Sequence, residues 1–307
     1  MISEFIDGES IQGQFLVSSC SKGVNNYGAA YLNMELRDAS GSINAKKWEV
    51  VNGDEELFVQ GNVVSVSGET LKYKDSLQMK ILSAKSVPIN EINVEKFLKQ
   101  PPIPKTELIN KYNNYVSSIK NPDCKALLDY FVNKYKDKLY DYPAAVSIHH
   151  EYISGLLMHS TSMADQLELL SKMYNVDRDL VITGALLHDI GKMTELEGPI
   201  VFHYSTEGKL IGHISIMASE IKKAGEELGI KSEIPMLLQH MILSHHGQLE
   251  FGSPVMPLTK EALLLSLVDN LDSKMVVVNK ALETINPGEF SQKVFSLDNR
   301  MFYKPKE

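Results

Sequence analysis

The sequence predicts an α+β multidomain protein in which a small N-terminal β-barrel precedes an all-α domain. Its first ninety residues consist of short runs rich in β-branched and aromatic residues, a composition typical of strands. After Pro104 the apolar residues recur at helical spacing instead. All nine histidines lie between His149 and His246. The helical part therefore holds the side chains best suited to chemistry.

Five β-rich runs, bounded by Gly, Asn, Asp and Ser turns, make up the first part of the chain. They cover residues 11–19, 28–37, 41–48, 61–67 and 71–83. A short acidic helical segment over 52–57 separates the third run from the fourth. This pattern predicts a five-stranded OB-like barrel. Such barrels bind single strands by stacking bases on exposed aromatic rings beside a few cations.

Four aromatic residues are available for stacking in the predicted barrel: Phe15, Tyr31, Trp48 and Tyr73. Trp48 and Tyr73 are the candidates for nucleic-acid binding, with cations supplied by Lys46, Lys72 and Lys74. The alternative is that half of the aromatic rings belong to the core. Because strand neighbours point to opposite faces, only one of residues 47 and 48 can share a face with Lys46.

Prolines at 88, 101, 102 and 104 punctuate the next stretch, which cannot form one continuous helix. We therefore expect four parts. They are a barrel over 1–87, a Pro-containing linker over 88–104, a helical domain over 105–297 and a basic tail over 298–307.

His188 and Asp189 stand side by side after the apolar run 181–187. A buried charge of this kind requires a partner. An imidazole and a carboxylate suit borderline divalent metals, and two carboxylate oxygens can bridge two ions. The alternative is a helix end that the two side chains merely cap. The local contexts of the other histidines favour the metal: His159 follows an apolar run, His213 follows a glycine, and His245 and His246 end a predicted helix.

The ordered series His159, His188-Asp189, Gly-His213, His245-His246 and Asp269 resembles the HD superfamily of metal-dependent phosphohydrolases. The resemblance rests on five separated elements in the same order. It implies one metal site formed by His159, His188, Asp189 and Asp269, and a second formed by Asp189, His213, His245 and His246. Seven ligands are too many for one ion, so we expect two divalent metal ions, which clamp an in-line displacement at phosphorus and activate water.

Two residues are expected to act directly in catalysis: Asp189 as the bridging ligand and Lys192 as a cation that neutralises a phosphate oxygen. A solvent-facing lysine at a helix end is the alternative for Lys192. Asp272 either replaces Asp269 as a ligand or holds an imidazole in place. His149 and His150 are interpreted as phosphate or substrate contacts, with plain surface histidines as the alternative.

With its barrel, its linker and the motifs His-Asp-Ile-Gly-Lys and Ser-His-His-Gly, the chain is similar to the YhaM-type 3′–5′ exoribonucleases. This resemblance spans nearly the whole chain. It implies removal of nucleotides from single-stranded RNA, action on single-stranded DNA as well, and use of Mn²⁺. One departure is Met158, which stands where such proteins commonly have glutamate before the first motif histidine.

Two other functions remain open at the level of sequence. The histidine motifs fit a phosphohydrolase of a small nucleotide or cyclic dinucleotide nearly as well, but such an enzyme has no need of a barrel. The other possible function is that of a binding protein in which the metals only stabilise the fold. The presence of both Asp189 and Lys192 argues against it.

Composition narrows the choice of partner and compartment. The net charge of −8 argues against a broad basic surface for nucleic acid, and residues 1–90 contain eight Lys or Arg against eleven Asp or Glu. Binding must therefore depend on local placement. The chain has no long apolar run and no secretory start, so we expect neither membrane insertion nor export. Its two cysteines favour a cytoplasmic protein with reduced thiols, and oligomerisation stays open.

Overall fold

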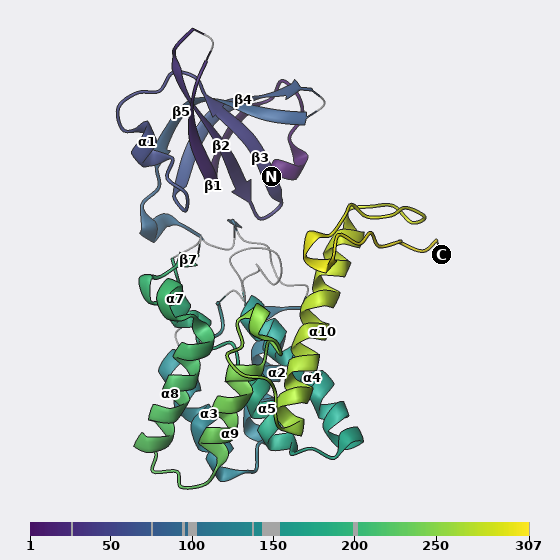
Figure 1. Ribbon diagram of the computed structural model, residues 1–307. Coiled ribbons are helices and arrows are strands. Elements are labelled where there is room, and N and C mark those ends of the chain that lie inside the picture. The colour runs from purple at the N-terminus through teal and green to yellow at the C-terminus, as the bar shows by residue number, and fades with distance from the viewer. Residues whose placement is uncertain are drawn as a thin grey trace. The chain divides into compact units, whose positions relative to one another are not determined.

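The computed structural model describes residues 1–25, 27–74, 76–93, 96–97, 103–136, 138–142, 154–198 and 202–306. The chain divides into two compact units, shown as ribbons in Figure 1. One contains residues 1–100 with 198–203, and the other contains 101–197 with 204–307. The boundaries expected from sequence, at 87, 104 and 297, stay predictions.

The first unit contains a closed five-stranded barrel. Its strands are β1 (Ser10–Val24), β2 (Ala30–Asp38), β3 (Gly41–Lys47), β4 (Val63–Tyr73) and β5 (Ser76–Ser86). They close in the order β1-β2-β3-β5-β4, and β3 with β5 is the parallel pair. The short helix α1 (Asp54–Leu57) follows β3. The OB-like barrel predicted from sequence is confirmed, including the helix between the third and fourth strands.

Alternation along the strands separates a core from an outer face. On β2, for example, Leu32, Met34 and Leu36 are buried in the barrel core. On β3, Lys47 points inward and its ammonium lies 3.7 Å from the Asp54 carboxylate. Residue 48 therefore shares the outer face with residue 46, as the strand period requires.

The expected boundary between the fourth and fifth strands, between residues 67 and 71, is wrong. Strand β4 continues to Tyr73, and Lys74, at φ 47°, stands at the turn. Gly68 lies inside β4 at a β-bulge. A Cβ at this position would lie 2.5 Å from the Lys80 carbonyl oxygen. The glycine therefore permits close approach of β5 and does not mark a turn.

The second unit is helical. Its helices are α2 (Lys105–Ser118), α3 (Pro122–Tyr135), α4 (Gly155–Tyr174), α5 (Arg178–Leu187), α6 (Lys192–Glu195), α7 (Thr206–Ile211), α8 (His213–Glu227), α9 (Ile234–Ser244) and α10 (Lys260–Glu283). The two-residue strands β6 (Leu196–Glu197) and β7 (His203–Tyr204) lie between α6 and α7 in the sequence. None of the helices among the described residues has the length and apolar character that crossing a membrane requires.

Helix α5 is the centre of the helical unit. Every residue from Leu180 to its end at Leu187 is buried, and α5 contacts α2, α3, α4, α9 and α10. Its first turn is capped by Asp177, whose side chain accepts a hydrogen bond from the Leu180 amide. The C-terminal end of α5 therefore lies in the interior of the helical unit.

The C-terminal segment folds back beyond α10. Phe290 pairs with Tyr303, and Val294 pairs with Arg300. The Lys304 ammonium donates hydrogen bonds to the carbonyl groups of Leu282, in the last turn of α10, and of Ile285, just after it. These bonds satisfy carbonyl groups that a helix end leaves without intrahelical partners.

Candidate active site

Five helices or helix ends bring the predicted metal ligands together in the helical unit. His159 lies on α4, and Asp269 lies on α10. His188 and Asp189 follow the buried end of α5, which explains why both are almost fully buried. The remaining three come from the start of α8 and the end of α9: His213, His245 and His246.

The glycine of the motif His-Asp-Ile-Gly-Lys lets the start of α6 approach the start of α8. A Cβ at Gly191 would collide with the backbone carbonyl of His213. Because glycine has no Cβ, the start of α6 packs directly against the start of α8. This contact places His213 beside Asp189.

The first cluster consists of His159, His188, Asp189 and Asp269. The His159 Nε2 atom lies 3.1 Å from Asp269 Oδ1 and 3.2 Å from His188 Nε2. The His188 Nε2 atom lies 3.3 Å from Asp189 Oδ2. The donor atoms of His159, His188 and Asp269 are close enough together to hold a metal ion.

The second cluster consists of Asp189, His213, His245 and His246. Here Asp189 presents its other oxygen, Oδ1, at 3.5 Å from His213 Nε2 and 3.9 Å from His245 Nε2. The three histidines also form a group close enough to hold an ion. The two oxygens of one carboxylate are thus divided between the two clusters.

Three polar atoms of the second cluster are buried without a hydrogen-bond partner: Asp189 Oδ1, His213 Nε2 and His245 Nε2. Such atoms are costly unless something binds them. A divalent cation satisfies all three, because each is a lone-pair donor of a type that transition metals accept. The residues present therefore fit a metal.

The imidazoles are all oriented through their Nδ1 atoms. His188 bonds the Ala185 carbonyl at 2.9 Å, His245 bonds the Ile242 carbonyl at 2.7 Å, and His246 bonds the Phe251 carbonyl at 2.7 Å. A carbonyl oxygen only accepts, so Nδ1 carries the proton in each ring. Each Nε2 therefore carries the lone pair that a metal requires.

The first cluster has a carboxylate behind one imidazole. The Asp272 Oδ2 atom accepts from His159 Nδ1 at 2.8 Å. Its Oδ1 atom accepts from the Ser162 hydroxyl at 2.5 Å and from the Gln166 amide at 3.3 Å. Of the two interpretations from sequence, this geometry favours Asp272 as the group that holds an imidazole. Sequence reasoning missed Ser162 and Gln166, although their spacing from His159 on α4 is helical.

A second carboxylate, Glu195, stands behind His213. Its Oε1 atom accepts from both the backbone amide and the Nδ1 atom of His213, each at 3.0 Å. Glu195 was also missed, because its contact with residue 213 spans a loop that no local pattern reveals. Each cluster therefore contains one histidine supported by a carboxylate, an arrangement that fixes the ring and raises its basicity.

Lys192 is directed at the bridging carboxylate. Its ammonium lies 2.7 Å from Asp189 Oδ2 and is largely buried. Burial alone would lower the pKa of Lys192, but the attraction of Asp189 outweighs it and raises that pKa. Burial would likewise raise the pKa of Asp189, yet Lys192 and His188 hold it well below the ordinary value. Both groups are therefore charged at neutral pH.

The histidines at the end of α9 are neutral in this environment. Burial lowers the pKa of His245 well below its ordinary value, and burial also lowers the pKa of His246. A neutral imidazole is the form that binds a metal.

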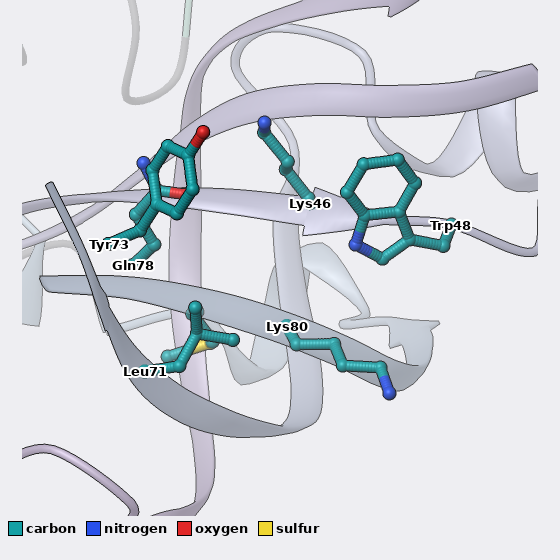
Figure 2. Close-up of a pocket in the computed structure, with 7 residues that line it drawn as sticks. Lys46, Trp48, Leu71, Tyr73, Gln78 and Lys80 are labelled. Atoms are coloured by element: carbon teal, nitrogen blue, oxygen red, sulfur yellow. The ribbon is translucent and has the colours of Figure 1, made fainter. Parts of the chain in front are cut away.

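The barrel has a pocket on its outer face, and three of the predicted nucleic-acid contacts line it (Figure 2). They are Lys46, Trp48 and Tyr73, joined by Leu71, Gln78, Met79 and Lys80. The side chains of Trp48 and Tyr73 are 42% and 51% exposed, respectively. Both rings are therefore accessible for stacking.

The remaining aromatic and cationic candidates fall in different places. Phe15 is buried in the barrel core, and Tyr31 packs on Trp48 with ring centroids 4.9 Å apart. The Lys74 ammonium lies 5.5 Å from the centre of the Tyr73 ring. Lys72 and Lys74 are exposed but do not line the pocket. The last two candidates, His149 and His150, lie outside the described residues.

Known proteins resemble this chain over nearly its full length. The HD domain family matches residues 156–274. The 3′-5′ exoribonuclease YhaM proteins of Bacillus subtilis (strain 168) and Bacillus velezensis are each 42% identical over 300 residues, covering 97% of this chain and 96% of theirs. The YhaM protein of Geobacillus sp. (strain WCH70) is also 42% identical, over 97% of this chain and 93% of its own. This chain therefore belongs to the YhaM family of 3′-5′ exoribonucleases.

Proposed function

We propose that this protein is a metal-dependent 3′–5′ exoribonuclease that removes nucleotides from single-stranded RNA by hydrolysis at a site for two divalent ions. The proposal depends on one observation: Asp189 directs one carboxylate oxygen toward each cluster. The Nε2 atoms of His213 and His245 beside it are buried and make no hydrogen bond. Two ions bound there supply an activated water and stabilise the charge of an in-line displacement at phosphorus.

The protein side chains have separate tasks in this proposal. His159, His188 and Asp269 would hold one ion, His213, His245 and His246 would hold the other, and Asp189 would offer one oxygen to each. Lys192 lies beside the same Asp189 oxygen that faces the first cluster. Its ammonium is therefore positioned to neutralise a non-bridging oxygen of the scissile phosphate.

Asp272 is expected to control metal affinity and to leave the chemical step intact. Asp272→Asn removes the negative charge behind His159 but keeps the shape of the side chain. We expect metal affinity to fall by about 10–100-fold, with activity recovering at saturating metal. Isothermal titration calorimetry and metal-dependent activity test this. Asp129→Asn, a change on α3 at the Lys125 ion pair, is the control; equal effects of both variants would contradict the role.

Metal binding is expected to release a proton from His159. Burial disfavours the charged imidazole, but hydrogen bonds to Asp269 and Asp272 outweigh it and raise the pKa of His159 to about 10. Below that pH the metal-free ring is protonated, while a metal ligand must be neutral, so affinity should rise with pH. Calorimetry in buffers of different ionisation enthalpy measures the protons released. The same heat in every buffer would contradict this expectation.

The barrel is proposed to hold the RNA strand upstream of the terminal linkage through Trp48, Tyr73 and Lys46. Trp48→Ala should weaken binding of single-stranded RNA about tenfold, because stacking of one base contributes roughly 1–3 kcal/mol. The rate at saturating RNA should stay unchanged. Fluorescence anisotropy and steady-state kinetics separate the two effects. Tyr174→Ala, which removes an exposed ring at the end of α4, is the control.

Further parts of the proposal concern metal, substrate range and compartment. We propose Mn²⁺ as the metal, because the resemblance to the YhaM-type exoribonucleases implies it; imidazole nitrogen and carboxylate oxygen are both donors that divalent ions of this kind accept. Single-stranded DNA is proposed as a second substrate, since stacking on aromatic rings does not depend on the sugar. A cytoplasmic location fits Cys20 and Cys124, which are both free thiols.

A further inference from the structure

The outer face of the barrel combines aromatic, cationic and amide side chains from three paired strands. In the register of β3 and β5, Lys46 stands beside Lys80. In the register of β4 and β5, Leu71 stands beside Gln78. Together with Trp48 and Tyr73, these residues line the pocket in Figure 2. Residues that are distant in sequence thus form one continuous surface.

Lys46 and Lys80 occupy paired positions on neighbouring strands. Two cations on one face of the barrel favour the binding of an anion there. Glu69 is the partner of Lys80 on β4, yet in the described parts of the chain no ion pair is formed by Lys46 or Lys80. Figure 2 shows the two ammonium groups directed to opposite rims of the pocket. Each ammonium group is therefore available to an anion at its own rim of the pocket.

The rings provide a fixed platform between those rims. Tyr31 packs on Trp48 at a ring-centroid distance of 4.9 Å, and the Lys46 ammonium lies 5.4 Å from the Trp48 ring centre. Trp48 is thus held from one side and faces the pocket with the rest of its surface. Gln78 and Tyr73 stand together across the pocket from it (Figure 2).

Gln78 is the amide side chain that faces this pocket. An amide carries an acceptor and a donor next to each other, which match the amino group and the neighbouring ring nitrogen of adenine. The pocket therefore has the means to discriminate between bases as well as to hold them.

We propose that the pocket holds one nucleotide of the RNA strand, with Lys46 and Lys80 contacting the phosphates on either side of it and Gln78 reading the base edge in favour of adenine. The proposal rests on the proposed function, in which the barrel binds single-stranded RNA. It adds a base preference and assigns Gln78 as a specificity-determining residue and Lys80 as a phosphate contact.

Binding of short fluorescent oligo(A) and oligo(U) RNA to the full-length protein tests the base preference. An Asp189→Ala background keeps the RNA intact during the anisotropy measurement. We expect oligo(A) to bind about tenfold tighter than oligo(U), the difference that one bidentate base contact provides. Gln78→Leu should abolish most of this difference. Gln14→Leu, the same change at an exposed position of β1, should keep it.

Salt dependence tests the phosphate contact. Lys80→Ala should make the slope of log affinity against log salt shallower by about 0.7, the value for one phosphate of a single strand. Lys85→Ala removes the same charge from an exposed position of β5 outside the pocket and should not change the slope.

Two results would overturn the inference while leaving the proposed function in place. One is equal binding of oligo(A) and oligo(U) by the unchanged pocket, and the other is a preference that survives Gln78→Leu. Failure of the protein to bind either RNA would instead contradict the proposed role of the barrel as a whole.

Discussion

Asp189→Ala is expected to abolish RNA hydrolysis while RNA binding stays largely intact. Asp189 offers one oxygen to each cluster, so its loss removes a ligand from both proposed metal sites and frees Lys192 from its ion pair. Losing several kcal/mol of transition-state stabilisation lowers a rate by about a thousandfold or more. The rate of degradation of a labelled RNA measures this effect, and anisotropy measures binding.

A matched variant separates chemistry from folding. Asp189→Ala leaves a void at a fully buried position, whereas Asp189→Asn keeps the volume and removes the charge. Both variants should be inactive, and both should still unfold in a cooperative thermal transition, as a folded protein does. An Asp189→Asn protein that degrades RNA at the parent rate would show that the site is elsewhere.

Removing divalent metal is expected to have an equally large effect. A chelator should eliminate activity, and adding Mn²⁺ back should restore it, because the unpartnered lone pairs in the second cluster then regain their cation. The chelated protein should also unfold at a lower temperature, since ligands that bind the folded state stabilise it.

The number of bound ions distinguishes the proposed two-metal site from a site that holds one ion. Elemental analysis of the reloaded protein should give two ions per chain. His246→Ala, which removes a ligand of the second cluster alone, should reduce this number toward one. A protein that retains two ions in the His246→Ala variant, or that holds a single ion before mutation, would contradict the two-metal arrangement.

The order of elements in the barrel could be predicted because the strand period and the position of the short helix are local features. The end of β4 could not be predicted in the same way. Gly68 signals either a turn or a close approach of two backbones, and only the pairing with β5 decides between them. The core position of Phe15 likewise depends on how the barrel closes.

The seven candidate ligands could be proposed from sequence because their motifs occur in a fixed order, and the structure brings them together. Their role as ligands stays a prediction. The groups behind them were harder to predict. The contact of Glu195 with His213 arises from packing between segments that carry no shared pattern. The carbonyls that orient His188 and His245 lie three residues earlier in the same helices, and the sequence does not show which nitrogen of each ring they bind.

The residues that line the barrel pocket could also be predicted only in part. Lys46, Trp48 and Tyr73 could be selected by residue type, but Gln78 and Lys80 come from a strand whose register with β3 no local sequence pattern reveals. Lys72 and Lys74 were selected for their closeness in sequence to Tyr73. Neither lines the pocket, because neighbouring residues on a strand face opposite sides and Lys74 belongs to the turn.

The most direct test of the proposed function is degradation of a single-stranded RNA labelled at its 5′ end. The purified protein and its Asp189→Ala variant are compared with and without Mn²⁺. We expect a ladder of labelled products that shortens from the 3′ end, appears only with metal, and is missing from the variant. Intact RNA under every condition, or a ladder that persists in the Asp189→Ala protein, would contradict a metal-dependent exoribonuclease at this site.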